Sequence, residues 1–304
     1  MPPLEKVFLI IDESGAKGYS DKGETYPGEI GVMAGFLVLE KNIKNVRVDL
    51  DSIKAKYLSD GKVHITDMPP DKQENLRQEI FSYIIDNNLA CVFEAIHNEG
   101  FFRYFESINK ICAEANKQRQ SNIKISNNEA KELLHEQLFQ GAFGKGIALC
   151  IDNFGNTFHL SVITDNIDEG IKRRFSVSAN ELLDFGDKKV RIVTGYDPCN
   201  KTVVRGDITT ELGNIKDIID DYSKIRFSID CEDTGLTLAA DVIANSLNYH
   251  FKNRIATELG SPLNTKNALK DFPLQSVMYG LWESQDLNYC SDAFFMYPED
   301  SEKK

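Results

Sequence analysis

Residues 7–15, with the sequence Val-Phe-Leu-Ile-Ile-Asp-Glu-Ser-Gly, decide the fold class of this chain. Five apolar residues in a row, three of them β-branched, predict a fully buried strand. The run ends in two carboxylates, Asp12 and Glu13, and Gly15 then permits a sharp turn. Sheets of α/β proteins place ligands at the carboxyl ends of their strands. Buried charge must be compensated, and a bound cation is one of the few groups that can compensate two adjacent carboxylates at once. The alternative is that Asp12 caps the next turn while Glu13 faces solvent.

The bulk composition is that of a globular protein. The chain has 304 residues, of which 41% are hydrophobic and 27% are charged, so it is long enough to bury a substantial core. Its N-terminus resembles no signal peptide, and no later run reaches the length of a membrane span, so we expect a cytoplasmic protein with no membrane partner. Six cysteines without a C-x-x-C pair favour reduced thiols over a zinc site or a disulfide framework.

Charge is distributed unevenly along the chain. The net charge of −12 argues against unselective binding of nucleic acid, because phosphates attract Lys and Arg. Two segments, 101–124 and 170–191, nevertheless each carry a local charge of +3. They are either solvated helix faces or phosphate contacts, depending on where they lie. The first also holds Phe101, Phe102, Tyr104 and Phe105, for which core packing is favoured over base stacking.

The apolar patterns alternate between strands and helices. Beyond the first strand, we expect strands over 30–39, 89–96, 158–165, 190–194 and 225–229. We expect helices over 46–58, 71–86, 101–117, 128–151, 167–183 and 237–253. The strand over 30–39 should lie antiparallel to the first, with the Asp12 strand central in the sheet and the strand ending in Asp165 beside it. Periodicity is lost beyond residue 261, which indicates a single α/β domain over 1–254 and a C-terminal extension over 255–304 packed on it.

Two further aspartates stand out against apolar surroundings. Asp165 ends its predicted strand, and Asp241 lies in the run Leu236–Ala244, which reads as a largely buried helix. A buried Asp needs an ion pair or a cation. The alternative for Asp241 is an ion pair with a buried Arg, or a capping role. Small neighbours such as Ala239 and Ala240 would let the helix approach the sheet and bring Asp241 to the strand ends.

These residues together resemble a known family. The opening I-D-E-S-G, the loop residue His64, the strand-end Asp165 and the late L-x-A-A-D-V-I-A are similar to proteins of the domain-of-unknown-function family 3800 over residues 6–254. That family looks like a branch of the ribonuclease H-like superfamily. The resemblance implies a mixed sheet flanked by helices, with Asp12, Asp165 and Asp241 as metal ligands and Glu13 in the same motif. Asp168 is an alternative to Asp165 as the middle ligand.

A site of this kind predicts phosphodiester hydrolysis. Carboxylate ligands favour Mg²⁺ or Mn²⁺ over zinc, and a two-metal-type mechanism would activate water and stabilise the leaving oxygen. We therefore expect a nuclease with Asp12, Glu13, Asp165, Asp241 and His64 as catalytic residues. His64 would act in proton transfer, although a loop histidine is more often a surface residue. The acidic segment 227–235 argues for a narrowly selected or partner-assisted nucleic-acid substrate.

Other function classes fit the sequence less well. A haloacid-dehalogenase-like phosphatase would need a second Asp two residues after the first, where Ser14 stands. An actin-like ATPase would need a second Gly-rich phosphate loop, and no P-loop or dinucleotide fingerprint occurs. The open alternatives are a phosphatase that acts on a small phosphate ester and a non-catalytic, metal-stabilised binding or regulatory module that serves a protein partner.

Overall fold

A mixed six-stranded sheet forms the centre of the fold. The computed structural model describes residues 4–17, 24–57, 64–118, 124–125, 133–183, 188–197, 199–211, 224–280 and 290–298. Across the sheet the strands follow the order β8 (Arg226–Cys231), β5 (Phe158–Thr164), β1 (Glu5–Gly15), β2 (Ile30–Leu39), β3 (Cys91–His97) and β9 (Met278–Tyr279). β1 is antiparallel to β2 and parallel to β5. The predicted neighbours of the Asp12 strand are therefore confirmed.

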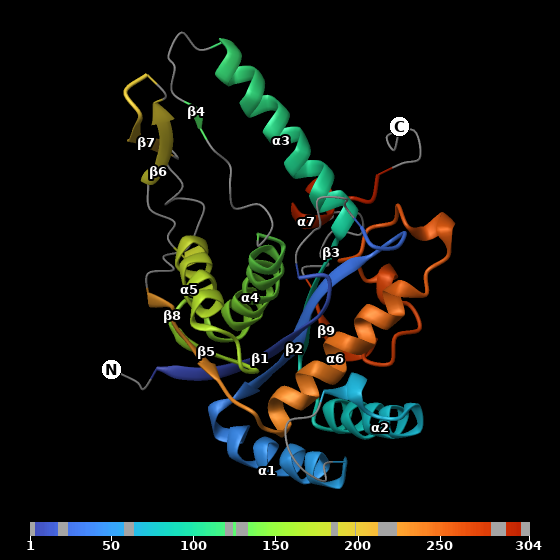
Figure 1. The fold of residues 1–304 in the computed structure, drawn as a ribbon. Coiled ribbons are helices and arrows are strands. Elements are labelled where there is room, and N and C mark those ends of the chain that lie inside the picture. The colour runs from blue at the N-terminus through green and yellow to red at the C-terminus, as the bar shows by residue number, and fades with distance from the viewer. Residues whose placement is uncertain are drawn as a thin grey trace.

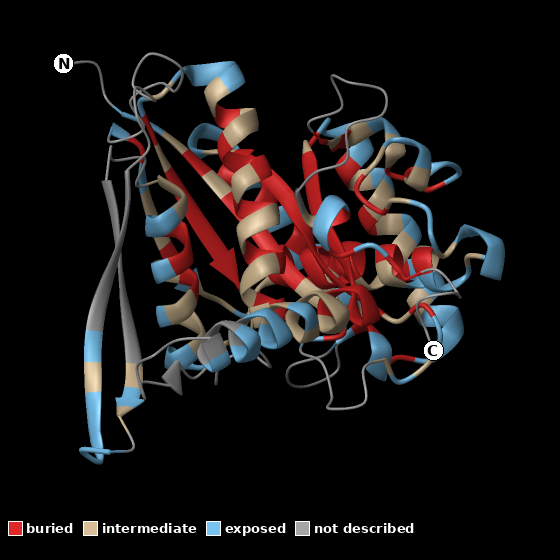
Figure 2. Ribbon diagram, turned by 90° about the horizontal axis from the view of Figure 1, so that it is seen from above, coloured by how far each residue is buried: buried red, intermediate tan, exposed pale blue. Residues whose placement is uncertain are grey.

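The central strands are apolar along most of their length because both faces of the sheet are covered. Every residue of β3 is buried, as is all of β2 except its last residue, Leu39. Strands that are buried on both faces read as continuous hydrophobic runs rather than as alternating patterns. Figure 2 shows these buried strands between two layers of helices. The sheet is thus the middle of three layers.

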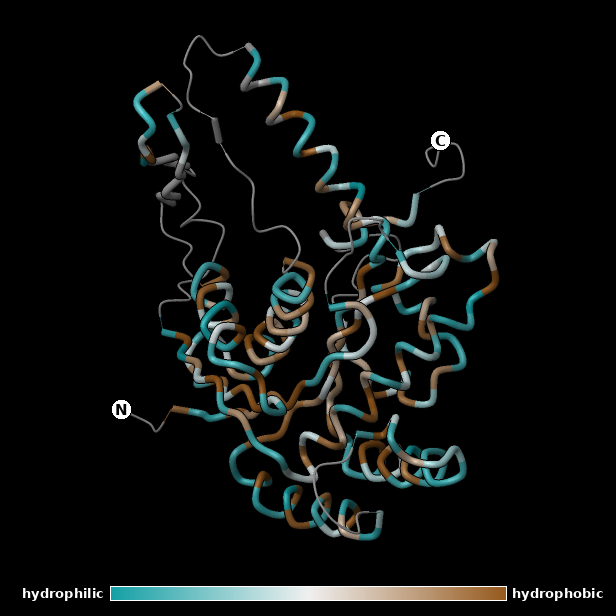
Figure 3. The backbone as a smooth tube through the Cα atoms, viewed as in Figure 1, coloured by the Kyte–Doolittle hydropathy of each residue, from teal (hydrophilic) through white to brown (hydrophobic). Residues whose placement is uncertain are grey.

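One face of the sheet is covered by α1 (Glu40–Tyr57), α2 (Pro70–Asp86) and α6 (Gly235–Lys252) (Figure 1). Buried residues recur at helical spacing, at Ile43, Val46, Leu50 and Ile53 in α1, which turns one stripe of this helix toward the core. In Figure 3, α1 and α2 alternate between hydrophobic and hydrophilic segments, in keeping with one buried face each. α6 is more deeply buried and packs on β1 and β2.

The opposite face is covered by α4 (Leu133–Phe154) and α5 (Glu169–Leu183), with the start of α3 (Asn98–Gln118) beside them. Phe139 of α4 stacks on Phe175 of α5 with ring centroids 4.2 Å apart. At the base of α3, Phe101 is fully buried and contacts Phe105 and Phe295. Phe101 therefore packs in the core with Tyr104 and Phe105 half-buried against it, as the sequence favours, whereas Phe102 is half-buried and lies beneath the Arg103 guanidinium.

A second sheet stands apart from the main one. β6 (Lys188–Asp197) and β7 (Thr202–Glu211) form an antiparallel hairpin, and β4 (Lys124–Ile125) pairs with the edge of β6. The hairpin projects away from the body of the molecule (Figures 1 and 2). The sequence predicts only a short strand, 190–194, in this region, and β7 is missed altogether.

The segment after α6 is built from short turns that pack on the body. It contains 3₁₀ turns at Ala256–Glu258, Asn267–Leu269 and Gln275–Val277, followed by β9 and by the short helix α7 (Cys290–Phe294). Asp292 of α7 accepts hydrogen bonds from the backbone N–H groups of Leu263 and Asn264. Among the helices that the structure describes, none is both long enough and apolar enough to span a bilayer.

Most helix boundaries differ from the sequence prediction at the N-terminal end. α1 begins at Glu40 rather than at 46, and the buried stripe already starts in its first turn with Ile43, the one apolar residue among positions 40–45. α5 begins at Glu169 rather than at 167, because Asp168 accepts a hydrogen bond from the Ile171 N–H and so caps the helix. Residues 128–132 of the helix predicted over 128–151 lie outside the described residues, and its end extends to Phe154.

Candidate functional site

Three elements far apart in the sequence bring carboxylates to one end of the sheet. The parallel pairing of β1 with β5 runs to Ile10 opposite Ile163, and Asp12 and Asp165 each follow two residues later. The register therefore places these two aspartates level with each other where the pairing of β1 with β5 ends, although β1 itself continues to Gly15 in its pairing with β2. Gly15 ends β1 with φ of +81°, a conformation that glycine adopts easily.

Asp241 reaches the same place from α6. Its helix contacts β1 and β2 closely because it presents small residues there, and Ala239, Ala240 and Ala244 are fully buried. Asp241 Oδ2 accepts a hydrogen bond of 2.9 Å from the backbone N–H of Ile65, and His64 Nδ1 lies 3.8 Å from the same oxygen. The loop before α2 is thereby tied to α6, and His64 stands at the rim of the site with nearly half of its side chain exposed.

These residues share a cavity of about 360 Å³. Its lining includes all five residues that the sequence predicts to be catalytic: Asp12, Glu13, Asp165, Asp241 and His64. It also includes residues that the sequence analysis does not identify, namely Ser14, Gly15, Lys17, Thr66, Asn166, Ile167 and Asn245. Asp168, the alternative to Asp165, is not among the lining residues, and its carboxylate caps α5 instead.

The pKa values of two of the carboxylates are raised. Burial raises the pKa of Asp12 to about 9, and repulsion from Glu13 and Asp241 adds to the shift. Burial likewise raises the pKa of Asp241, against the opposing effects of the Ile65 N–H and His64. Both groups are therefore held away from water and close to other negative charges. A cation in the cavity would relieve this repulsion and favour the ionised form of each carboxylate.

Glu13 has partners of its own and behaves differently. Burial acts to raise its pKa, but His135 and Lys17 outweigh burial and lower the pKa below its usual range. Lys17 forms an ion pair with Glu13 Oε1. His135 Nε2 lies 3.8 Å from Glu13 Oε2, a separation too long for a hydrogen bond, so we attribute its influence to charge. Of the two adjacent carboxylates, Glu13 therefore has a cationic partner in Lys17, whereas Lys17 forms no ion pair with Asp12.

His135 and Asn245 are the main residues that sequence reasoning misses. His135 lies within the long apolar pattern of α4, where a single histidine gives no signal of its own. Asn245 follows Asp241 by one helical turn, and this i, i+4 spacing on a helix already singled out could have identified it. Asp233 is a further acid nearby, lining a small recess next to Asp12 and Asp241, where it is paired with Lys54.

The donor set of the cavity fits a hydrated hard cation. Oxygen ligands from carboxylates suit Mg²⁺ and Mn²⁺. Within the part of the chain that the structure describes, no three His, Cys, Asp or Glu side chains are grouped tightly enough to hold an ion as they stand. Mg²⁺ usually keeps several waters and takes only one or two carboxylates from the protein. The residues present therefore fit such an ion without forming a closed cage around it.

Comparison with known proteins adds no assignment. No protein-family model matches the chain, and no curated protein is significantly similar to it.

Proposed function

We propose that this protein is a metal-dependent nuclease that hydrolyses phosphodiester bonds with Mg²⁺ or Mn²⁺. The observation that carries the proposal is the convergence of Asp12, Asp165 and Asp241 from β1, β5 and α6 on one cavity. The raised pKa values of Asp12 and Asp241 support it, since buried carboxylates close to other negative charges are suited to binding a cation. Relation to the domain-of-unknown-function family 3800 and a ribonuclease H-like fold are part of the same proposal.

The side chains of the site have separable roles. Asp12, Asp165 and Asp241 would hold the hydrated ion, directly or through its waters, and when bound it supplies an activated water and charge stabilisation at the phosphate. His64 stands beside Asp241, half exposed, where it can hold or give up a proton at the edge of the cavity. Glu13 is fixed between Lys17 and His135 and keeps its charge, which orients the end of β1.

The basic segments bear on substrate binding. Among their side chains, Arg103 pairs with Glu99 and Glu106, and Arg174 lies 3.5 Å from Glu136. Part of the local charge of +3 in each segment is therefore neutralised within the fold. We expect the remaining basic side chains to contact phosphates, so that binding of nucleic acid weakens as salt concentration rises.

The test is a cleavage assay with a matched pair of variants. Labelled single- and double-stranded DNA and RNA, and a small phosphate monoester, are incubated with the full chain in Mg²⁺, Mn²⁺ or EDTA. We expect Asp12→Asn to abolish cleavage and Asp168→Asn to leave it unchanged, because Asn caps a helix as well as Asp does. Hydrolysis of the monoester alone would instead indicate a phosphatase. Metal binding without any turnover would indicate a binding or regulatory module.

A further inference from the structure

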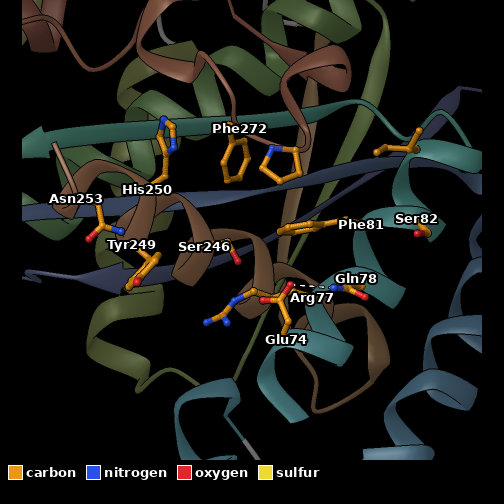
Figure 4. A pocket seen from close by; sticks show the side chains of 12 residues that line it. Glu74, Arg77, Gln78, Phe81, Ser82, Ser246, Tyr249, His250, Asn253 and Phe272 are labelled. Carbon is orange, nitrogen blue, oxygen red and sulfur yellow. Dashed lines mark hydrogen bonds between the residues drawn. The ribbon is translucent and has the colours of Figure 1, made fainter. Parts of the chain in front are cut away.

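A second cavity, of about 600 Å³, lies between α2 and α6 (Figure 4). One wall is a stripe of α2 in which Glu74, Gln78, Phe81 and Ile85 recur at spacings of three and four residues. The other is formed by Ser246, Tyr249 and His250 of α6 and by Asn253, which directly follows this helix. Phe272 and Pro273 from the segment after α6 complete the lining. This volume is in the range of sites that hold small organic groups.

The lining combines aromatic rings with amide groups. Phe81 and Phe272 contact each other edge to face, with centroids 6.1 Å apart, and His250 lies 5.4 Å from Phe272. Tyr249 is 63% exposed, so its ring is open to a ligand. Gln78 and Asn253 add hydrogen-bond donors and acceptors. Proteins bind an unpaired nucleobase by stacking it on aromatic rings and by hydrogen bonds to the polar edge of the base.

Arg77 joins this cavity to the acidic one. Arg77 is one of the residues that line the cavity. Its Nη2 donates hydrogen bonds to Asn245 Oδ1, at 3.0 Å, and to Gln73 Oε1, at 3.1 Å. Asn245 lines the acidic cavity, and the next residue, Ser246, lines the second one. Within the described residues Arg77 uses only Nη2 in hydrogen bonds, so Nε and Nη1 remain to bind an anion.

The separation of the two cavities is set by α6. Asp241 and Tyr249 are eight residues apart on one helix, which corresponds to about 12 Å at 1.5 Å per residue. An extended strand can cross this distance, with its backbone passing Arg77. A duplex cannot use the second cavity, because its bases are stacked and paired inside the helix and would first have to be extruded.

We propose that the cavity between α2 and α6 binds an unpaired base of a single-stranded nucleic acid whose backbone continues past Arg77 into the acidic cavity. This inference rests on the proposed function and specifies the substrate class of that site. Tyr249 is the stacking platform, and Arg77 contacts a phosphate between the base and the scissile bond.

Binding, rather than cleavage, tests this proposal. The full chain carrying Asp12→Asn is titrated into labelled 12-nucleotide single strands of DNA and RNA, and into the matching duplexes, and fluorescence anisotropy is recorded in Mg²⁺. We expect single strands to bind at least tenfold more tightly than duplexes. Adding Tyr249→Ala should weaken single-strand binding about fivefold or more, and adding Tyr249→Phe should leave it unchanged, because one stacked base accounts for that much.

A second pair of variants consists of one that fills the cavity from its rim and a matched control outside it. Ser82 is exposed at its rim, and Ser52 is exposed on α1 outside its lining. Ser82→Trp should weaken single-strand binding as Tyr249→Ala does, whereas Ser52→Trp should not. Equal affinity for duplexes, normal binding by both Tyr249→Ala and Ser82→Trp, or no binding of single strands would each overturn the proposal. Its failure is separate from that of the nuclease proposal, which is decided by cleavage in the wild-type protein.

Discussion

The side-chain amide of Asn264 pairs with both backbone polar groups of Ala95. Its Oδ1 accepts from the Ala95 N–H at 3.0 Å, and its Nδ2 donates to the Ala95 carbonyl oxygen at 2.8 Å. The side chain thereby takes the place of a neighbouring strand beside β3. Asn264 is fully buried and also accepts a hydrogen bond from Lys145 Nζ. One residue of the C-terminal extension thus satisfies polar groups in the middle of the fold.

Replacing Asn264 should destabilise the folded protein. We expect Asn264→Ala to lower the free energy of unfolding by about 3 kcal/mol or more, because two buried backbone groups and a buried lysine lose a partner. Asn267→Ala, at an exposed position three residues further on, should change it by less than about 0.5 kcal/mol. Urea unfolding of the two variants measures the difference. Similar midpoints for both would contradict the anchoring role.

Two glycines of α4 should respond to alanine in opposite directions. A Cβ at Gly141 would lie 2.3 Å from the carboxyl group of Glu94, which is buried against Lys145. Gly141→Ala should therefore destabilise the protein by about 1–3 kcal/mol through overpacking. At Gly144 the nearest atom would be 3.5 Å away, so Gly144→Ala should stabilise it by about 0.5–1 kcal/mol as the helix gains propensity. Thermal unfolding of both variants would show whether the signs differ.

Asp12→Asn should stabilise the metal-free protein at alkaline pH. The pKa of Asp12 is raised from 3.8 to about 9 in the folded state. The stability that its protonated form contributes is fully present below about pH 3.8 and is lost as pH rises toward 9. In EDTA at pH 8, the melting temperature of Asp12→Asn should exceed that of the wild type, and the gap should narrow at pH 5.

The same variant should respond less to metal. Mn²⁺ should raise the melting temperature of the wild type more than that of Asp12→Asn, since a ligand that binds only the folded state stabilises it. Asp168→Asn serves as the control and should respond as the wild type does. An equal Mn²⁺ response in all three proteins would count against Asp12 as a ligand.

His97 should make the protein sensitive to acid. Burial, assisted by the charge of Arg254, lowers its pKa from 6.5 to about 3. The unfolded chain therefore binds more protons than the folded one between these values, and stability is lost as pH falls below about 6.5. When the pH is lowered from 7 to 5, the free energy of unfolding should fall by about 2 kcal/mol less in His97→Gln than in the wild type. Urea unfolding at both pH values tests this, and the pH dependence of the two proteins should coincide above pH 7.

The sequence predicts the parts of this fold whose burial is continuous. β1, β2 and β5 are long apolar runs, so their existence follows from composition, and Asp12, Asp165 and Asp241 are conspicuous because each interrupts or ends such a run. β7 leaves no comparable signal, because its hairpin projects from the body and its residues need not match a core. β9 is two residues long and is defined only by its pairing with β3. Its position depends on tertiary contacts.

The chemistry around the carboxylates is harder to infer than the carboxylates themselves. His135 and Asn245 contribute because α4 and α6 pack at particular rotations against the sheet, and a single sequence does not specify those rotations. Asp168 shows the converse. Its proximity to Asp165 in sequence makes it an alternative ligand, whereas in the structure its carboxylate accepts a hydrogen bond from the Ile171 N–H at the start of α5.

The strand order also has a consequence for folding of the protein during its synthesis on the ribosome. β1, β2 and β3 are consecutive neighbours and can pair while the rest of the chain is still being made. The partner of the other edge of β1 is β5, and the aspartate that faces Asp12 from α6 is translated later still. A chain interrupted before α6 would not carry a weaker version of the site. It would leave uncovered the apolar face of the sheet on which α6 packs, and exposed apolar surface of this kind makes incomplete proteins aggregate.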